Sequence, residues 1–443
     1  MNIKLSEHFT YKKILRFTLP SIIMMIFTSI YGVVDGFFVS NYVGKTPFAA
    51  VNLIMPFLMI LGAVGFMFGT GGGALIAKTM GEGKSEKANS LFSLFVYTTA
   101  VCGIIIGALG IVFIRPVASL LGAEGEMLNN CVTYGRIILI ALPFFMLQYE
   151  FQSFFATAEK PQLGLVVTIA AGFTNMILDA LFIAFFKWGL FGAAAATAIS
   201  QIVGGSIPLI YFFRKNSSRL KLTKCKFEKN MLLRACVNGS SELMSNISMS
   251  IVSMLYNFQL MKYVGENGVA AYGVLMYVNL FFLAAFIGYS VGTAPIIGYN
   301  YGAQNYSELT NLLKSSFTII GIFSVCMFTL SEFLAYPIAK IFVGYDKELM
   351  NLTLNGFRIV SFLFLFAGVS IFGSAFFTAL NNGLISALIS FLRTLVFQVS
   401  AVLIIPIFLG INGIWLSTVT AEVMSVIITL IFIFKMKNKY HYM

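Results

Sequence analysis

Charged residues are scarce in this chain. Asp, Glu, Lys and Arg make up 10% of its 443 residues, whereas an average soluble domain has roughly 25%. Hydrophobic residues make up 58%, and Phe alone occurs 46 times, which is more apolar surface than a soluble fold of this size can cover. The composition therefore excludes a soluble enzyme, a disordered protein and a nucleic-acid-binding protein, and it indicates a polytopic membrane protein.

Histidine and cysteine are also rare. The two His, His8 and His441, lie near the chain ends, which argues against a buried histidine base or a zinc site. The five Cys form no CxxC spacing, so neither a disulfide framework nor a metal cluster is expected. An intramembrane enzyme would need a nucleophile with a base, a metal motif or an acidic cluster, and the sequence contains none. We therefore expect no enzyme, no catalytic residue and no cofactor.

Long apolar runs are abundant. Twelve of them are long enough to cross a bilayer of about 30 Å as helices, and transmembrane strands would be shorter with an alternating pattern. The sequence thus predicts an all-α polytopic membrane protein with twelve transmembrane helices. The predicted spans are 14–42, 48–77, 88–114, 127–157, 161–186, 189–213, 231–262, 268–298, 308–334, 350–379, 383–408 and 411–435.

The positive charges indicate the orientation in the membrane. The two termini and the loops after even-numbered spans hold 20 of the 29 Lys and Arg residues, eight of them between Arg214 and Arg234. By the positive-inside rule both termini are cytoplasmic. We therefore expect an N-lobe at 1–213, a cytoplasmic basic linker at 214–230 and a C-lobe at 231–443.

The chain repeats itself at an offset of 221 residues. Because each half has six predicted spans, the two halves share one orientation, which is a parallel repeat about an axis along the membrane normal. Repeats of this kind are the usual framework of alternating-access transport. Landmarks that keep the offset include Gly71 with Gly292, Gly81 with Gly302, Pro116 with Pro337, Gly189 with Gly410 and Thr197 with Thr418.

Acidic residues inside spans are the strongest functional signal, because a carboxylate in the membrane is costly and usually faces a cavity. Asp35 lies late in span 1 on a face that also carries Tyr31. Asn175 and Asp179 are one helical turn apart in span 5, and Thr197 follows in span 6 after a short turn. These side chains suit either sodium bound by oxygen ligands or a proton shared between carboxyls. The structural alternative is a neutral Asp that only joins helices.

A second group of polar residues suggests a substrate cavity. Glu242 lies on a polar stretch with Asn238, and Glu150 lies between Gln148 and Gln152. Together with Tyr31, these residues are candidates for attracting a cationic substrate or exchanging a proton. The alternative for Glu242 is a position in the first helical turn, close to the membrane surface.

Several segments match one known family in combination. They are Leu19-Pro20, Tyr31-Gly32-Val33-Val34-Asp35, Tyr42-Val43-Gly44, Gly81-Glu82-Gly83, Asn175-Met176-Ile177-Leu178-Asp179 and Ala196-Thr197. With the repeat, they resemble the multidrug and toxic compound extrusion (MATE) family over nearly the whole chain. The resemblance implies two six-helix lobes forming a V around a central cavity, and antiport of cationic or amphipathic compounds against protons or sodium.

The resemblance also implies which residues couple transport to an ion. In the DinF-like branch the N-lobe ion site matches Asp35, Asn175, Asp179 and Thr197. The NorM-like branch uses a glutamate in span 7, for which Glu242 is the candidate, and an aspartate in span 10, where this chain has no acid. We therefore expect coupling in the N-lobe and a closer relation to the DinF-like branch.

The remaining expectations follow from the same resemblance. We expect a multi-pass protein of a prokaryotic plasma (inner) membrane, monomeric and in contact with membrane lipids. Its partners would be small organic cations or amphipathic compounds, and no nucleic acid. One alternative is a lipid-linked oligosaccharide or lipid flippase of the same superfamily, although such relatives often have fourteen spans and basic cavities. A passive channel is another.

Overall fold

The computed structural model describes residues 3–442, and nearly all of them are helical. In the first half of the chain each long helix corresponds to one predicted span, and two helices continue into short π-helical turns. These elements are α1 (Tyr11–Phe38), η1 (Val39–Val43), α2 (Lys45–Gly81), α3 (Ser85–Leu120), α4 (Gly125–Thr157), α5 (Pro161–Asp179), η2 (Ala180–Phe185) and α6 (Gly189–Phe213).

The second half repeats this arrangement with more interruptions. A 3-10 turn divides the fourth pass of this half, and a π-helical turn divides the fifth. The elements are α7 (Lys229–Tyr263), α8 (Glu266–Gly302), α9 (Tyr306–Val343), α10 (Lys347–Val360), η3 (Ser361–Leu363), α11 (Phe364–Ala379), α12 (Gly383–Phe391), η4 (Leu392–Phe397) and α13 (Gln398–Tyr440).

Helix α13 contains the last reversal of the chain. Gly410, inside it, has a non-helical φ of 57°, as does Gly189 at 58°, its partner at the repeat offset. A straight helix would separate residues 393 and 422 by about 43 Å at 1.5 Å per residue. Arg393 and Glu422 nevertheless form an ion pair of 2.9 Å, so the chain turns back at Gly410.

Counting this reversal reconciles the helices with the sequence prediction. Within residues 3–442, ten helical segments are long and apolar enough to cross a membrane, and one of them, Gly383–Tyr440, reverses at Gly410 and makes two passes. The twelfth pass is the 35-residue α7, which is too polar to be recognised by hydropathy. The predicted all-α architecture is confirmed.

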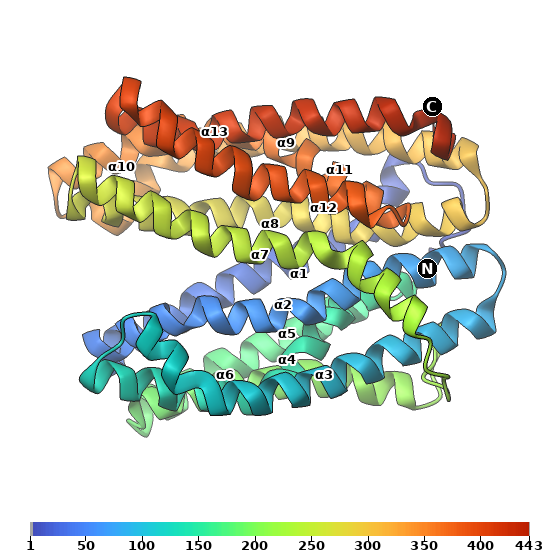
Figure 1. Cartoon of the computed structure of the whole chain (residues 1–443), viewed down its shortest axis with the longest axis horizontal. Coiled ribbons are helices and arrows are strands. Elements are labelled where there is room, and N and C mark those ends of the chain that lie inside the picture. The colour runs from blue at the N-terminus through green and yellow to red at the C-terminus, as the bar shows by residue number, and fades with distance from the viewer. Residues whose placement is uncertain (1–2, 443) are drawn as a thin grey trace.

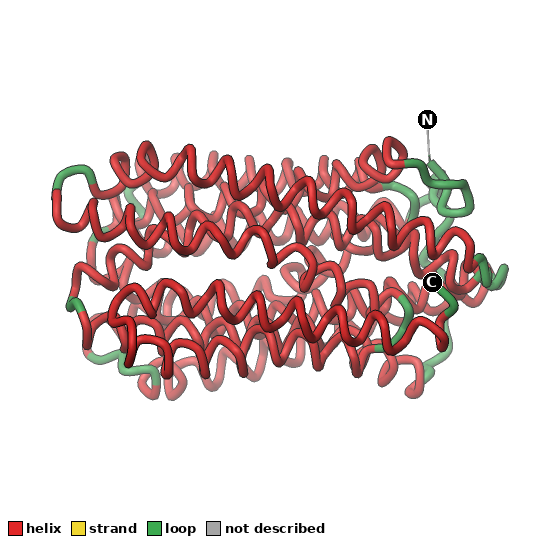
Figure 2. The backbone as a smooth tube through the Cα atoms, turned by 90° about the horizontal axis from the view of Figure 1, so that it is seen from above, coloured by secondary structure: helices red, strands yellow, loops and turns green. Residues whose placement is uncertain are grey.

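The passes form two bundles side by side, α1–α6 and α7–α13 (Figure 1). Both chain ends lie at one end of the molecule, which we call the terminal end. The irregular segments gather at the two ends of the helices, as Figure 2 shows, so the long middle region is helical throughout. This arrangement satisfies the backbone hydrogen bonds where lipid offers no partner.

At the terminal end, glycines allow the backbones of the two bundles to meet. A Cβ atom on Gly81 of α2 would lie 2.0 Å from the Tyr299 carbonyl oxygen of α8, and one on Gly302 would lie 2.0 Å from the Lys78 carbonyl oxygen. These two contacts are equivalent at the offset of 221 residues. The repeat is therefore a symmetry of the inter-lobe interface as well as of the sequence.

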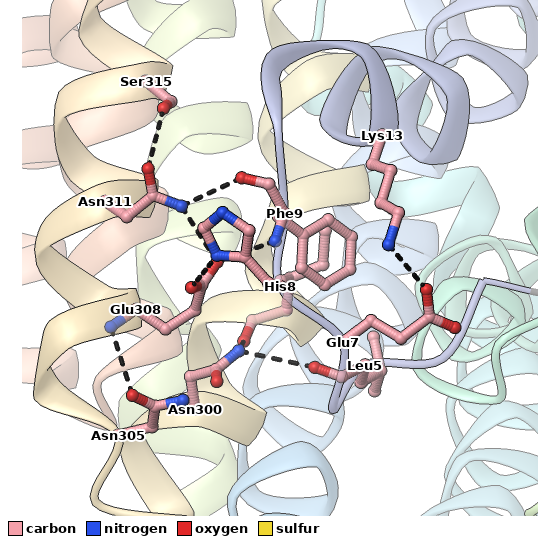
Figure 3. Close-up of polar contacts among 11 residues, drawn as sticks. Leu5, Glu7, His8, Phe9, Lys13, Asn300, Asn305, Glu308, Asn311 and Ser315 are labelled. Carbon is pink, nitrogen blue, oxygen red and sulfur yellow. Dashed lines mark hydrogen bonds and ion pairs between the residues drawn. The ribbon is translucent and has the colours of Figure 1, made fainter.

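The N-terminal segment, residues 3–10, fastens both bundles together at this end. The Leu5 amide donates to Glu159, which follows α4, at 2.9 Å. The Phe9 amide donates to one oxygen of Glu308 in α9 at 2.9 Å, and His8 Nδ1 lies 2.7 Å from the other oxygen (Figure 3). Leu5 and Phe9 are fully buried. We call this segment the N-terminal strap.

Candidate ion and substrate sites

The carboxyls of Asp35 and Asp179 lie close to the points where their helices change from α-helical to π-helical winding. Asp35 precedes the π-helical turn η1 by one turn of helix, and Asp179 is the last residue of α5 before η2. Both are buried. Such π-helical turns locally widen a helix and often occur at functional sites, and here they follow the two acids selected from the sequence.

The four residues predicted to couple transport to an ion lie together between α1, α5 and α6. Thr197 Oγ1 donates to Asp35 Oδ1 at 3.4 Å. Asn175 Nδ2 donates to Thr197 Oγ1 at 3.5 Å. Asp179, fully buried, lies close enough to Asp35 for the two carboxyls to interact electrostatically. The bonds are long, so this cluster is loosely satisfied by its own members.

Acceptor atoms in this cluster outnumber donors. Within the described residues, both carboxylate oxygens of Asp179 and the Asn175 amide oxygen have no hydrogen-bond donor. Buried polar atoms normally have partners, and two neighbouring carboxyls do not both ionise cheaply. A shared proton or a cation held by these oxygens would supply the missing partner, so the residues fit either ion.

Tyr134 of α4 belongs to the same cluster and was not identified from the sequence. It is fully buried, its hydroxyl has no partner among the described residues, and it lies beside Thr197 in range of the Asp35 charge. A tyrosine in an apolar span gives no local signal, because most such residues only pack. Only the fold places this donor next to the acids.

A central cavity of about 260 Å³ lies between the lobes. Its wall is mostly apolar, including Met249, Met276, Leu283 and Ile287. Among the described residues that line it, the charged side chains all come from the C-lobe. These are Glu242 of α7, Arg393 of η4 and Glu422 of α13.

Of the six residues predicted to line a substrate cavity, only Glu242 lies on this wall. Asn238 instead joins the lobes, donating to the carbonyl oxygens of Thr378 at 2.9 Å and Gly71 at 3.4 Å. Its buried amide nitrogen bonds backbone from both halves, whereas its Oδ1 has no partner within the described residues, and the residue lies between the lobes rather than on the cavity wall.

The other four lie within the N-lobe. Tyr31 faces Gln148 near Asp35. Glu150 is fully buried beside Thr99 of α3, and neither of its carboxyl oxygens has a partner within the described part of the chain. Gln152 is also buried, and its amide atoms likewise lack partners there. The sequence could not show this, because neighbouring residues on a helix point in different directions.

The sequence also gave no indication of an ion pair that the structure shows in the C-lobe. Arg393 Nε donates to both carboxylate oxygens of Glu422, at 2.9 and 3.0 Å, and Nη2 lies 2.9 Å from one of them. The two residues are 29 positions apart on antiparallel passes. Hydropathy shows that these passes exist, but not that these two faces meet.

Comparison with known families decides the protein's family. The MatE family model matches residues 20–181 and, a second time, residues 243–404. The chain belongs to the MATE family. The double match coincides with the internal repeat, the resemblance seen in the sequence is confirmed, and this MATE chain is a transporter rather than an enzyme. Its placement in the DinF-like branch stays a prediction.

Individual relatives agree with this assignment. The multidrug export protein MepA of Staphylococcus haemolyticus is 25% identical over 435 residues, covering 98% of this MATE chain and 95% of MepA. A multidrug resistance MATE transporter solved in an outward-facing conformation is 22% identical with a TM-score of 0.93, covering 99% of this chain and 98% of that one.

One structural neighbour bears a different functional description. A MOP superfamily transporter from Pyrococcus furiosus, described as having a binding pocket of reverse polarity, is 23% identical with a TM-score of 0.89, covering 97% of this MATE chain and 96% of that one. At this identity such likenesses establish the fold. The charge of this chain's cavity therefore follows from its own residues and not from those of the neighbour.

Proposed function

We propose that this MATE protein is a secondary active antiporter that exports cationic or amphipathic drugs and toxins in exchange for protons or sodium. The observation that carries the proposal is the buried Asp35–Asp179 pair: neither Asp179 carboxylate oxygen has a donor within residues 3–442, and Asp35 Oδ1 accepts a long bond of 3.4 Å from Thr197. A passive channel would not need such a pair. An antiporter needs it to bind an exchangeable ion.

Coupling requires that the ion distinguish two states of the protein. The pair lies between α1 and α5. Helix α1 also packs against α8 of the other lobe, where the backbone of Ile22 lies directly against Gly288. An ion that draws the two carboxyls together would therefore also position α1 relative to the C-lobe. Each tenfold difference in ion affinity between two states biases their populations by about 1.4 kcal/mol.

The cavity supports the substrate part of the proposal. Its apolar wall includes flexible methionines, which adapt to varied apolar shapes, and the Glu242 carboxyl offers a partner to an organic cation. The lipid or oligosaccharide flippase is less favoured, because pyrophosphate would need a basic wall. The one cation lining this cavity among the described residues, Arg393, is already neutralised by Glu422.

The charge distribution of the loops supports cytoplasmic termini in a prokaryotic inner membrane. With that orientation, the close contacts of Gly81 with Tyr299 and of Gly302 with Lys78 lie on the cytoplasmic side. We retain the division into an N-lobe at 1–213, a basic linker at 214–230 and a C-lobe at 231–443. The end of α6 at Phe213 and the start of α7 at Lys229 support this division. We propose that the protein acts as a monomer.

The test is transport by purified protein in liposomes, with proton and sodium gradients imposed separately. Asp35→Asn should abolish gradient-driven efflux while the protein still inserts and folds. Glu266→Gln, at an exposed acid in the first turn of α8, is the control and should transport normally. Efflux by Asp35→Asn at the wild-type rate would refute coupling through this pair.

A further inference from the structure

The cavity contains more charged groups than the binding of a simple cation requires. Glu242, Arg393 and Glu422 all line it. At the repeat offset of 221 residues their N-lobe counterparts are Ser21, Gly172 and Gln201, none of them charged. The charge of the cavity is therefore specific to the C-lobe, and it is separate from the Asp35–Asp179 pair.

Within this set of three, one carboxylate is bound and one is not. Arg393 holds Glu422 through Nε and Nη2, in the forked geometry that makes such pairs strong. The two side chains are only 16% and 6% exposed. Within residues 3–442, no donor bonds the Glu242 carboxyl. The side-chain amide of Asn246 instead donates to the backbone oxygen of Glu242. Glu242 lies within electrostatic range of Arg393.

Two carboxylates and one guanidinium leave a single net negative charge on the wall. Without the guanidinium the same wall would carry two negative charges close together in a poorly screened space. It would then attract a ligand with two positive charges. The arginine thus decides how many positive charges the cavity can balance.

We propose that Arg393 sets the valence of the transported ligand. By neutralising Glu422 it leaves Glu242 as the one carboxylate free to pair among the described residues that line the cavity, which matches the cavity to amphipathic cations with one positive charge and against dications. This inference rests on the proposed function and adds a selectivity rule to it. An anionic ligand is not expected at Arg393, because the guanidinium is already bonded to Glu422 and the carboxylates of Glu242 and Glu422 would repel such a ligand.

The test compares two ligands that differ by one charged group on the same chain. Decyltrimethylammonium carries one quaternary ammonium, and decamethylene-bis(trimethylammonium) carries two on the same ten-carbon chain. Binding of each to the full-length protein in nanodiscs is measured by competition with a fluorescent monovalent cation. The measured quantity is the ratio of the two affinities.

Three variants alter the wall charge in known steps. Arg393→Gln, with two unbalanced carboxylates, should shift the ratio toward the dication by about tenfold. Glu422→Gln leaves Arg393 unpaired and should weaken both ligands by about tenfold. The double variant Arg393→Gln/Glu422→Gln restores one net negative charge, so its ratio should return to the wild-type value.

An unchanged ratio in Arg393→Gln, or a ratio in the double variant that stays at the Arg393→Gln value, would overturn the proposal. If Arg393→Gln does not yield folded protein by size exclusion, the other two variants decide. The cation affinity that is weakened in Glu422→Gln must then return to the wild-type value in the double variant, and failure to return overturns the proposal. Absence of gradient-driven export by the wild type would instead refute the proposed function, because the binding ratio does not depend on transport.

Discussion

Adding one methyl group at Gly302 should force the lobes apart at the terminal end. Gly302 of α8 lies against the backbone of α2, where a new Cβ would be 2.0 Å from the Lys78 carbonyl oxygen. A backbone oxygen does not rotate away as a side chain would. Gly302→Ala therefore needs about 1 Å of additional separation between two packed helices to reach an ordinary contact.

The size of the effect follows from the cost of overpacking. Extra methyl groups in well-packed interfaces cost about 1–3 kcal/mol. This cost applies only while the terminal end is closed, so it acts as a difference between two states. The ratio of closed to open molecules should fall by roughly 5- to 150-fold. The equivalent change, Gly81→Ala, should have a similar effect, because its Cβ would lie 2.0 Å from the Tyr299 carbonyl oxygen.

Spin-label distances between the exposed positions 84 and 303 measure the opening directly. In Lys84→Cys/Ala303→Cys protein, the distance distribution should shift toward longer values when Gly302→Ala is added. Gly273→Ala is the control within the same helix, because a Cβ there has open space around it. An unchanged distribution in Gly302→Ala, or an equal shift in Gly273→Ala, would refute the reasoning.

Three further outcomes are expected. Asp179→Asn should lower ion-driven efflux at least about tenfold and flatten its dependence on pH or sodium, as liposome flux measurements would show; an unaltered dependence would contradict a shared site. Glu308→Gln removes the charge from the contacts with His8 and should weaken the N-terminal strap by about 1–2 kcal/mol. Limited proteolysis should then cleave near residues 12–13 faster than in Glu7→Gln, whose carboxyl bonds only within the segment 4–13; equal rates would count against the strap. A cysteine at Lys221 should react with an impermeant reagent from the cytoplasmic side alone, and strong labelling of intact cells would show that the proposed orientation is wrong.

The ion site was only partly readable from the sequence. Asn175 and Asp179 share a helical face because they are four residues apart, and a glycine turn makes α5 and α6 neighbours. The closeness of Asp35 came from family resemblance, because nothing in the spacing of α1 and α5 shows that they touch. Tyr134 gave no signal at all, since its neighbours in the sequence are unrelated to its neighbours in space.

The cavity was harder still to predict. Spacing marked Glu242 as a polar position in a membrane helix, and the structure places it on the cavity wall. It also selected Glu150 and Gln152, which the structure places inside the N-lobe. A residue one position further along a helix points about 100° away, so an uncertain helix rotation moves a side chain from the cavity into the bundle or toward lipid.

The sequence by itself determined the membrane location, the number of helical passes and the two-fold repeat. These properties depend on runs of residues and on offsets along the chain, which are linear quantities. The tertiary structure alone decided which side chains meet, as at Arg393 with Glu422 and at Gly302 with the backbone of Lys78. Those meetings depend on the rotation and tilt of each helix against its neighbours. Hydropathy does not specify these angles, because packing between whole helices sets them.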